Sequence, residues 1–562
     1  MIRYLALVFL IRFGFGTPYR DSEGLVVDGT RHGVYNLKVE LDGKEDGLYY
    51  GKNEEKYRGK EVNSHGEYNG QSDGKSHGEY GGQSNGNKGY NGRSDGKDHG
   101  GHNRRKDREG DNKKMVYQQF YQFDQSPFKD MKEYEMCDGS YKEEYRQVYC
   151  KGPLLEAVNH LRIYNDSKDY VDSVLKQAPA IIIAEFQKRF GDEPDVSQID
   201  RSDLQKFIDE FFSPPESELD NCEPEDWTER PTNILKIQDA NLRDWALNLN
   251  GLWKTLCRRV KTTVFADKER HSLIPVNQPF IVPGGRFREF YYWDTYWIIK
   301  GLLVSGMQTS SRYMLKNMLQ MVEQFGFVPN GGRAYYTRRS HPPTLIPAVY
   351  EYYQASGDRS FVNSSLSLLE KEFNFWAEQR SKAFQIDGDT VRAYFYESPT
   401  NVPRPESFLA DYEVAINMKE EDRPFFFKAA ASAAESGWDF SSRWFRDDQT
   451  LQSMETQNIA PVDLNAFLCY NMDILGYLFE VTGYSGKADE YQRKFDRFRK
   501  TFEKIFYNET EGAWYDYNIR TEAHNLRVYP SIAVPLFTGC YNRLDESKKC
   551  QAFLINLGKA NS

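Results

Sequence analysis

From about Cys137 onward, apolar side chains recur along the chain at the spacing of a helix. One stripe repeats every three or four residues, as one face of a helix does, and comprises Leu366, Leu369, Phe373 and Trp376. Two further stripes share this spacing: Leu464, Leu468, Met472, Leu475 and Phe479, and then Ala488, Tyr491, Phe495, Phe498 and Phe502. The glycine-bounded segment 483–486 separates them, which predicts a helical hairpin. Because strand-like alternation is short and scattered, the pattern predicts an all-α fold, either an array of hairpins or an α/α barrel.

The chain before residue 116 has a different character. Residues 64–103 contain 12 Gly and no Val, Ile, Leu, Met, Phe or Trp, and the segment 64–75 recurs with few changes at 76–87. Such a composition buries too little apolar surface to offset the ordering of the backbone. We therefore predict a disordered low-complexity segment over residues 17–115 and one globular domain over residues 116–562.

The first 16 residues predict export from the cytoplasm. A short basic start precedes an apolar run over residues 4–11, and Gly14 and Gly16 supply the small residues of a cleavage site. These features predict a signal peptide over residues 1–16 and a secreted protein. Arg12 interrupts the apolar run, so a buried N-terminal strand is the alternative. Three N-glycosylation sequons fit secretion, at Asn165, Asn363 and Asn508.

Composition narrows the classes of function. Lys and Arg number 73 against 83 Asp and Glu, and the resulting net charge of −10 disfavours a nucleic-acid-binding role. No run of 18 apolar residues occurs, so we expect no transmembrane helix in this chain. The seven cysteines have no zinc-binding spacing. Cys137 and Cys150 can pair in an oxidising compartment, whereas we expect Cys469, which lies on a helical stripe, to be a buried free thiol.

Four loops between the predicted helices mix charged and aromatic side chains. Residues 283–297 read PGGRFREFYYWDTYW, and residues 329–343 read PNGGRAYYTRRSHPP. The others are residues 404–407 (RPES) and 435–444 (ESGWDFSSRW). Buried charges need partners, so these segments are poor core material. Aromatic faces can cover the C–H faces of a sugar while Arg, Asp and Glu bind its hydroxyls, so the loops predict a carbohydrate pocket.

These four segments, in this order, resemble the signatures of the trehalases, which are inverting glycoside hydrolases that split α,α-trehalose into two glucose molecules. The resemblance runs from about Cys137 to the C-terminus, and the sequence around Cys150 is insect-like. It implies an (α/α)6 barrel, incomplete at its C-terminal end. It also implies a disaccharide substrate and neither a metal nor a cofactor.

Position by position, the resemblance implies that Asp439 is the catalytic general acid. It also implies nine substrate contacts: Arg286, Trp293, Asp294, Asn330, Arg339, Ser340, Arg404, Glu406 and Gly437. His341 occupies a position where the family has Gln, which implies an altered contact. A general acid must stay protonated near the working pH, so we expect Trp438 and Trp444 to desolvate Asp439.

The base expected of an inverting enzyme is missing from this sequence. Trehalases carry a further Q-W-D signature and a downstream Glu that activates water, and neither occurs before Ser562. We therefore expect a truncated gene model or isoform, which alone hydrolyses little or no trehalose, because each acid–base group contributes about 10²–10⁴-fold. Glu406 or Asp294 acting as the base is a less favoured alternative. The competing hypothesis is a non-catalytic sugar-binding protein on a trehalase scaffold.

Overall fold

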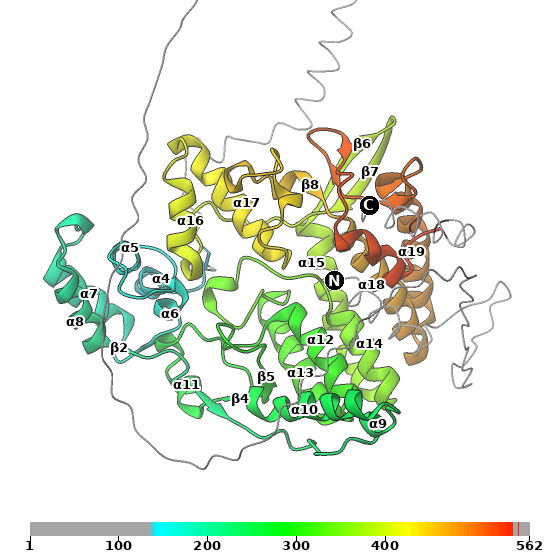
Figure 1. Ribbon diagram of the computed structural model, residues 1–562, viewed down its shortest axis with the longest axis horizontal. Helices are drawn as coiled ribbons and strands as arrows, with labels where there is room; N and C mark the ends of the chain where they lie inside the picture. The colour runs from blue at the N-terminus through cyan, green and yellow to red at the C-terminus, as the bar shows by residue number, and fades with distance from the viewer. Residues whose placement is uncertain (1–135, 138, 543–548, 550–552, 554–562) are drawn as a thin grey trace, which may run out of the picture. The chain divides into compact units, whose positions relative to one another are not determined.

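The computed structural model describes residues 136–137, 139–542, 549 and 553 (Figure 1). The predicted signal peptide (1–16) and low-complexity segment (17–115) lie outside these residues. The described chain is mostly helical, and its strands form sheets of only two or three strands, all with antiparallel neighbours. The prediction of an all-α fold is therefore confirmed.

A small helical lobe, drawn in cyan to blue-green in Figure 1, begins the described chain. Its elements are α4 (Glu143–Tyr149), α5 (Pro153–His160), α6 (Ser167–Val171), β1 (Val174–Leu175), α7 (Pro179–Phe190), α8 (Arg201–Phe211) and β2 (Phe212–Ser213). Their apolar faces form a separate hydrophobic core, which later loops join through Tyr291, Tyr336 and Phe408. The lobe therefore packs directly on loops that belong to the helical body.

The body contains the longer helices. They are α9 (Thr232–Leu235), α10 (Ala240–Leu256), α11 (Thr262–Ala266), α12 (Tyr292–Val304), α13 (Gln308–Phe325), α14 (Leu345–Ser356), α15 (Arg359–Gln379), α16 (Phe408–Ala415), α17 (Arg423–Glu435), α18 (Val462–Thr482), α19 (Ser485–Phe506) and α20 (Val534–Thr538). The strands are β3 (Leu219–Asn221), β4 (Cys257–Val260), β5 (Phe280–Ile281), β6 (Ser381–Ile386), β7 (Asp389–Tyr394), β8 (Ile459–Ala460), β9 (Tyr507–Asn508), β10 (Ala513–Trp514), β11 (Tyr517–Asn518) and β12 (Ala523–His524).

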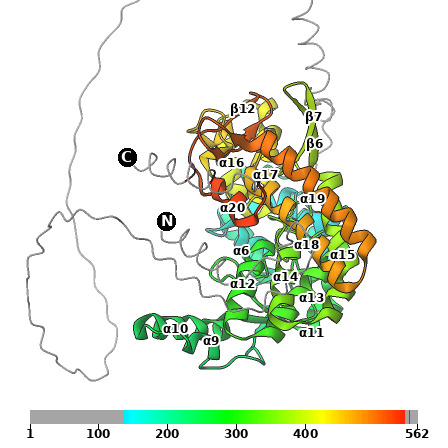
Figure 2. The same cartoon turned by 90° about the vertical axis from the view of Figure 1, so that its right-hand side faces the viewer.

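The long helices pack as hairpins in two layers, as an α/α barrel requires. Helix α12 pairs with α13, α14 with α15, and α18 with α19, while α12, α14, α18 and α20 contact one another in sequence (Figure 2). Helix α18 is buried nearly all round, as an inner helix should be, whereas α19 buries one face through residues such as Tyr491 and Phe502. The inner layer therefore places helix ends side by side, where the loops between them can meet.

The predicted stripes and turn are confirmed. The stripe that ends at Trp376 is buried on α15, and the two later stripes lie on α18 and α19. Gly483 ends α18 with a φ of +96°, a left-handed conformation that glycine adopts readily. Among the described residues, no helix combines the length and apolar character needed to cross a bilayer.

The described chain contains three disulfides, and one of them corrects the sequence analysis. Cys137 pairs with Cys150, as predicted, and Cys222 pairs with Cys257. Cys469 is buried as expected, but it is not a free thiol, because it bonds to Cys540. The bond spans 71 residues, and the local helical pattern around Cys469 carries no information about so distant a partner.

Two helical glycines give a matched test of the packing between α10 and α12. A Cβ on Gly301 of α12 would lie 2.8 Å from the ring of Trp253, whose indole N–H donates to Ser305 Oγ. A Cβ on Gly251 of α10 would meet nothing within 4 Å. We expect Gly251→Ala to raise the free energy of unfolding by up to about 1 kcal/mol, through helix propensity. We expect Gly301→Ala to lower it by about 1–3 kcal/mol, through overpacking. Urea denaturation measures both changes, and a stabilised Gly301→Ala would contradict the packing described here.

Candidate active site

A pocket of mixed polar and aromatic character lies where four segments meet. These are residues 286–294, which run into the first turn of α12, residues 330–341, residues 404–407, and residues 434–439 at the end of α17. Its lining consists of Arg286, Phe287, Tyr291, Trp293, Asp294, Asn330, Tyr336, Arg339, His341, Arg404, Glu406, Ser407, Ala434, Gly437 and Asp439. The four loops singled out in the sequence therefore do come together.

The structure brings nearly all of the predicted site residues into this pocket. Asp439 lines it, and so do all the predicted substrate contacts except Ser340. Ser340 is fully buried elsewhere: its backbone N–H donates to Glu435 Oε1 at 2.8 Å and its hydroxyl to the Val328 carbonyl at 2.8 Å. Its own carbonyl accepts from Asn330 Nδ2 at 2.8 Å, so Ser340 supports a lining residue and is not one itself.

Five lining residues were not named as contacts from the sequence: Phe287, Tyr291, Tyr336, Ser407 and Ala434. Four of them belong to the loop motifs that carry the resemblance, so their place near the site could be inferred from the sequence, and His341, expected to make an altered contact, also lines the pocket. Ala434 is the exception, because it lies in the last turn of an alanine-rich helix that has the pattern of a core element.

Each arginine of the pocket has an acidic or carbonyl partner. Arg404 makes a two-pronged pair with Asp411, with Nε–Oδ2 and Nη2–Oδ1 distances of 2.8 and 2.6 Å. Arg339 Nη2 donates to Glu406 Oε1 at 2.6 Å. The side chains of Arg339 and Glu406 are each only 3% exposed, so this is a buried pair and not a weak surface ion pair.

Several buried polar atoms of the pocket lack a hydrogen-bond partner among the described residues. These atoms are Nε and Nη1 of Arg339, Oε2 of Glu406 and Nδ1 of His341. A buried donor or acceptor without a partner costs free energy, about 1–3 kcal/mol and more for a charged group. The residues that carry these atoms all line one pocket, and a ligand that both donates and accepts, as a sugar hydroxyl does, offers such groups partners.

A close backbone contact shapes the wall beside Asp439. Gly437 has a φ of +70°, and a Cβ at this position would lie 3.1 Å from the indole ring of Trp293. Two features therefore favour glycine at this position: the left-handed backbone conformation and the close approach of the Trp293 ring. This contact fixes the distance between the Asp439 loop and the first turn of α12.

The two tryptophans near Asp439 do not have the role expected from the sequence. Trp438 and Trp444 stack on the guanidinium of Arg443, at 5.1 and 4.4 Å from their ring centroids. Arg443 is itself fully buried and paired with Asp463 and Asp516. Asp439 is exposed, so the expectation that these rings desolvate it is wrong. They anchor the loop that presents Asp439.

Comparison with known proteins decides the family. The trehalase family profile matches residues 162–561 of the chain. The trehalase of Apis mellifera is 41% identical over 403 residues, which cover 70% of this chain and 64% of that protein. The trehalase of Homo sapiens is 37% identical over 411 residues, which cover 73% of this chain and 70% of that protein.

The chain belongs to the trehalase family. It spans about two thirds of the length of these curated relatives. Among solved structures, the neutral trehalase Nth1 from Saccharomyces cerevisiae is similar, with a TM-score of 0.42 and 19% identity. That match covers 49% of this chain and 54% of the yeast chain. The resemblance read from the four loop motifs is thus confirmed.

The carboxyl groups of this trehalase-family pocket differ in their electrostatics. Burial raises the pKa of Asp294 to about 6. Burial would also raise the pKa of Glu406, but the charges of Arg339 and Arg404 outweigh it and lower this pKa below its ordinary value. Burial, and then the charge of Arg339, lower the pKa of His341 to about 3, so its imidazole is neutral at physiological pH. Glu406 is therefore a fixed negative charge, whereas ionisation of the buried Asp294 carboxyl group costs free energy.

Because ionising Asp294 costs free energy, we predict that Asp294→Asn stabilises the protein and does so more strongly at higher pH. The folded pKa of about 6 exceeds the ordinary value of 3.8, so wild type loses stability relative to the variant as pH rises from about 4 to 6. Two pKa units correspond to about 3 kcal/mol. We expect the variant's advantage to reach roughly that value at pH 7.5 and to be smaller at pH 4.5. Urea denaturation at pH 4.5 and 7.5 measures the difference in free energy of unfolding between variant and wild type. Asp489→Asn, at an exposed position, is the control. An equal difference at both pH values would contradict the raised pKa of Asp294.

Proposed function

We propose that the protein hydrolyses α,α-trehalose to two glucose molecules in this pocket. The observation that carries the proposal is the set of buried, unpartnered polar atoms on Arg339, Glu406 and His341. Sugar hydroxyls can accept from the arginine and donate to the carboxylate at once, so one bound ring would satisfy several of these atoms. Trp293 and Phe287, which share the pocket, offer aromatic faces for the C–H side of the ring. The trehalase names of the curated relatives support the same substrate.

In the proposed reaction Asp439 is the general acid, and the anomeric configuration is inverted. Asp439 lies exposed on the pocket wall, where it can reach the glycosidic oxygen of a bound disaccharide. Inversion also needs a carboxylate that activates water on the opposite face of the ring. Asp294, Asn330, Arg404 and Glu406 bind and orient the substrate in this proposal.

We also propose that the protein is secreted and glycosylated. Disulfides persist in oxidising compartments, and the described chain holds three of them. The sequon residues Asn165 and Asn363 are exposed, as an acceptor must be. Asn508 is half-buried and its side chain contacts His524 and the Glu511 amide, so Asn165 and Asn363 are the favoured acceptors.

Asp439→Asn separates catalysis from binding. The variant is made in a host without N-glycosylation, because an Asn before Phe440 and Ser441 completes a sequon. The amide has nearly the same shape as the acid but has no acidic proton to donate, so we expect a loss of about 10²–10⁴-fold in kcat. Trehalose binding should stay within a few-fold of wild type, because Asp439 leaves the arginine contacts intact. Glucose release by the full-length protein and calorimetric titration with trehalose measure the two effects, and the exposed Asp489→Asn on α19 is the control.

Wild-type turnover by Asp439→Asn would remove Asp439 from the role of acid. Trehalose binding by the wild-type protein without any glucose release would instead favour the non-catalytic sugar-binding protein.

Arg339→Ala tests the observation that carries the proposal. The change removes two unpartnered donors and leaves Glu406 as a buried carboxylate without its ion-pair partner. We expect trehalose affinity and kcat/KM to fall at least about tenfold, since a lost charge-assisted hydrogen bond is worth roughly 1.5–3 kcal/mol. The matched control is Arg493→Ala on the exposed face of α19, which should leave both quantities unchanged. Unchanged affinity in Arg339→Ala would show that the sugar does not contact this arginine.

A further inference from the structure

Arg286 differs from the other arginines of the pocket in how it is held. Its side chain is 36% exposed, so packing alone does not fix it. Asp166 accepts two hydrogen bonds from it, with Nε–Oδ2 and Nη2–Oδ1 distances of 2.5 and 2.9 Å. Nη2 also donates to the backbone carbonyl of Glu406 at 2.6 Å. Without the carboxylate of Asp166, the guanidinium would keep one contact and could turn about its long side chain.

Asp166 comes from the N-terminal lobe and not from a pocket loop. It caps α6, where its Oδ1 accepts from the backbone N–H of Lys168 at 3.0 Å. A five-residue helix is not stable by itself, so tertiary contacts must hold α6 in place. The position of Asp166, and through it that of Arg286, therefore depends on what anchors α6.

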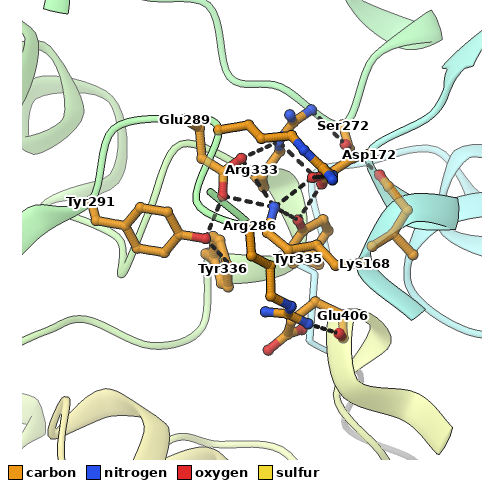
Figure 3. A network of polar contacts seen from close by, with 12 residues as sticks. Lys168, Asp172, Ser272, Arg286, Glu289, Tyr291, Arg333, Tyr335, Tyr336 and Glu406 are labelled. Atoms are coloured by element: carbon orange, nitrogen blue, oxygen red, sulfur yellow. Dashed lines mark hydrogen bonds and ion pairs between the residues drawn. The ribbon is translucent and has the colours of Figure 1, made fainter. Parts of the chain in front are cut away.

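The anchor of α6 is a cluster of buried charges, drawn in Figure 3. Lys168 lies 2.5 Å from Asp172, the C-cap of the same helix, and 2.9 Å from Glu289, and all three side chains are fully buried. Arg333 joins Asp172, Glu289 and Glu218 at 3.3, 3.0 and 2.7 Å. Breaking a buried pair leaves an uncompensated charge, which is strongly unfavourable, so this cluster admits one arrangement of α6.

The same cluster reaches the pocket at a second point. Glu289 accepts a short hydrogen bond from the Tyr291 hydroxyl, which in turn lies 2.8 Å from the Tyr336 hydroxyl. Both tyrosines line the pocket. The same buried network thus holds Tyr291 and Tyr336 directly, and it holds Arg286 through α6.

We infer that Asp166 is a positioning residue for the pocket: it orients Arg286 toward the substrate, and the buried charges that anchor α6 set its own position. The inference rests on the proposed function, because it assumes that Arg286 contacts the bound sugar. Nothing in the local sequence around Arg286 identifies Asp166, which lies 120 residues earlier.

The test compares two Asp→Asn substitutions at helix N-caps. Asn caps a helix about as well as Asp, so Asp166→Asn preserves α6 while removing the charge that Arg286 needs. Asp200→Asn is the matched control, because Asp200 caps α8 away from the pocket and accepts from the backbone N–H groups of Ser202 and Asp203. Both variants are made in a host without N-glycosylation, because Asp166 lies within the sequon of Asn165 and the change at position 200 creates the sequon N-R-S. We expect trehalose affinity, measured by calorimetry, to fall at least tenfold in Asp166→Asn and less than twofold in Asp200→Asn, with equal melting temperatures.

A double mutant decides whether Asp166 acts through Arg286. In the Arg286→Ala background, adding Asp166→Asn should change trehalose affinity less than twofold. A further tenfold loss there would mean that Asp166 supports the fold in another way, and would overturn the inference. Wild-type affinity in Asp166→Asn would overturn it as well.

A second readout needs no substrate. Phenylglyoxal modifies free guanidinium groups, and peptide mass spectrometry reports the modification of Arg286. We expect its rate to rise at least fivefold in Asp166→Asn and to stay unchanged in Asp200→Asn. If wild type fails to bind trehalose, the proposed function is wrong, and this rate still decides whether Asp166 holds Arg286. An unchanged rate in Asp166→Asn would overturn the inference.

Discussion

The arrangement of the pocket depends on two buried cations that share three buried carboxylates. Lys168 and Arg333 have no exposed side-chain surface, and neither do Asp172, Glu218 and Glu289, which surround them. A buried charge is tolerated only when it is paired and hydrogen-bonded, so these groups must all be in place together. They come from α6 and its C-cap, from the segment between β2 and β3, from the loop before α12 and from the loop after α13. Their ion pairs therefore join the N-terminal lobe to the helical body.

The helical hairpins form the scaffold, and buried ion pairs determine the conformation of the loops at the helix ends. The inner helices α12, α14 and α18 bury their side chains against one another and so form a stable support for the loops. The loops at their ends are rich in polar groups and cannot be ordered by apolar burial alone. They are ordered instead by ion pairs such as Arg404–Asp411 and Arg443–Asp463, together with the Trp293–Gly437 contact. The result is a pocket whose walls are rigid while some of its polar atoms stay without partners.

The sequence predicts the parts of this account that depend on local patterns. The stripe ending at Trp376 and the turn at Gly483 follow from spacing within a few residues, and the four loop motifs identify most of the lining. Contacts between distant segments do not follow. Asp166 and Arg286 are 120 residues apart, and Cys469 lies 71 residues from Cys540. The stacking of Trp438 and Trp444 on Arg443 is likewise not revealed by any pattern of neighbouring residues.

A crystal structure of Asp439→Asn with α,α-trehalose bound tests most directly how the pocket holds its substrate. We expect a glucosyl ring in the pocket, with hydroxyl oxygens about 2.7–3.2 Å from Arg339 Nε or Nη1 and from Glu406 Oε2. We also expect Arg286 to contact the sugar while it remains paired with Asp166. A sugar bound elsewhere, or one that leaves the buried atoms of Arg339 and Glu406 without partners, would contradict it.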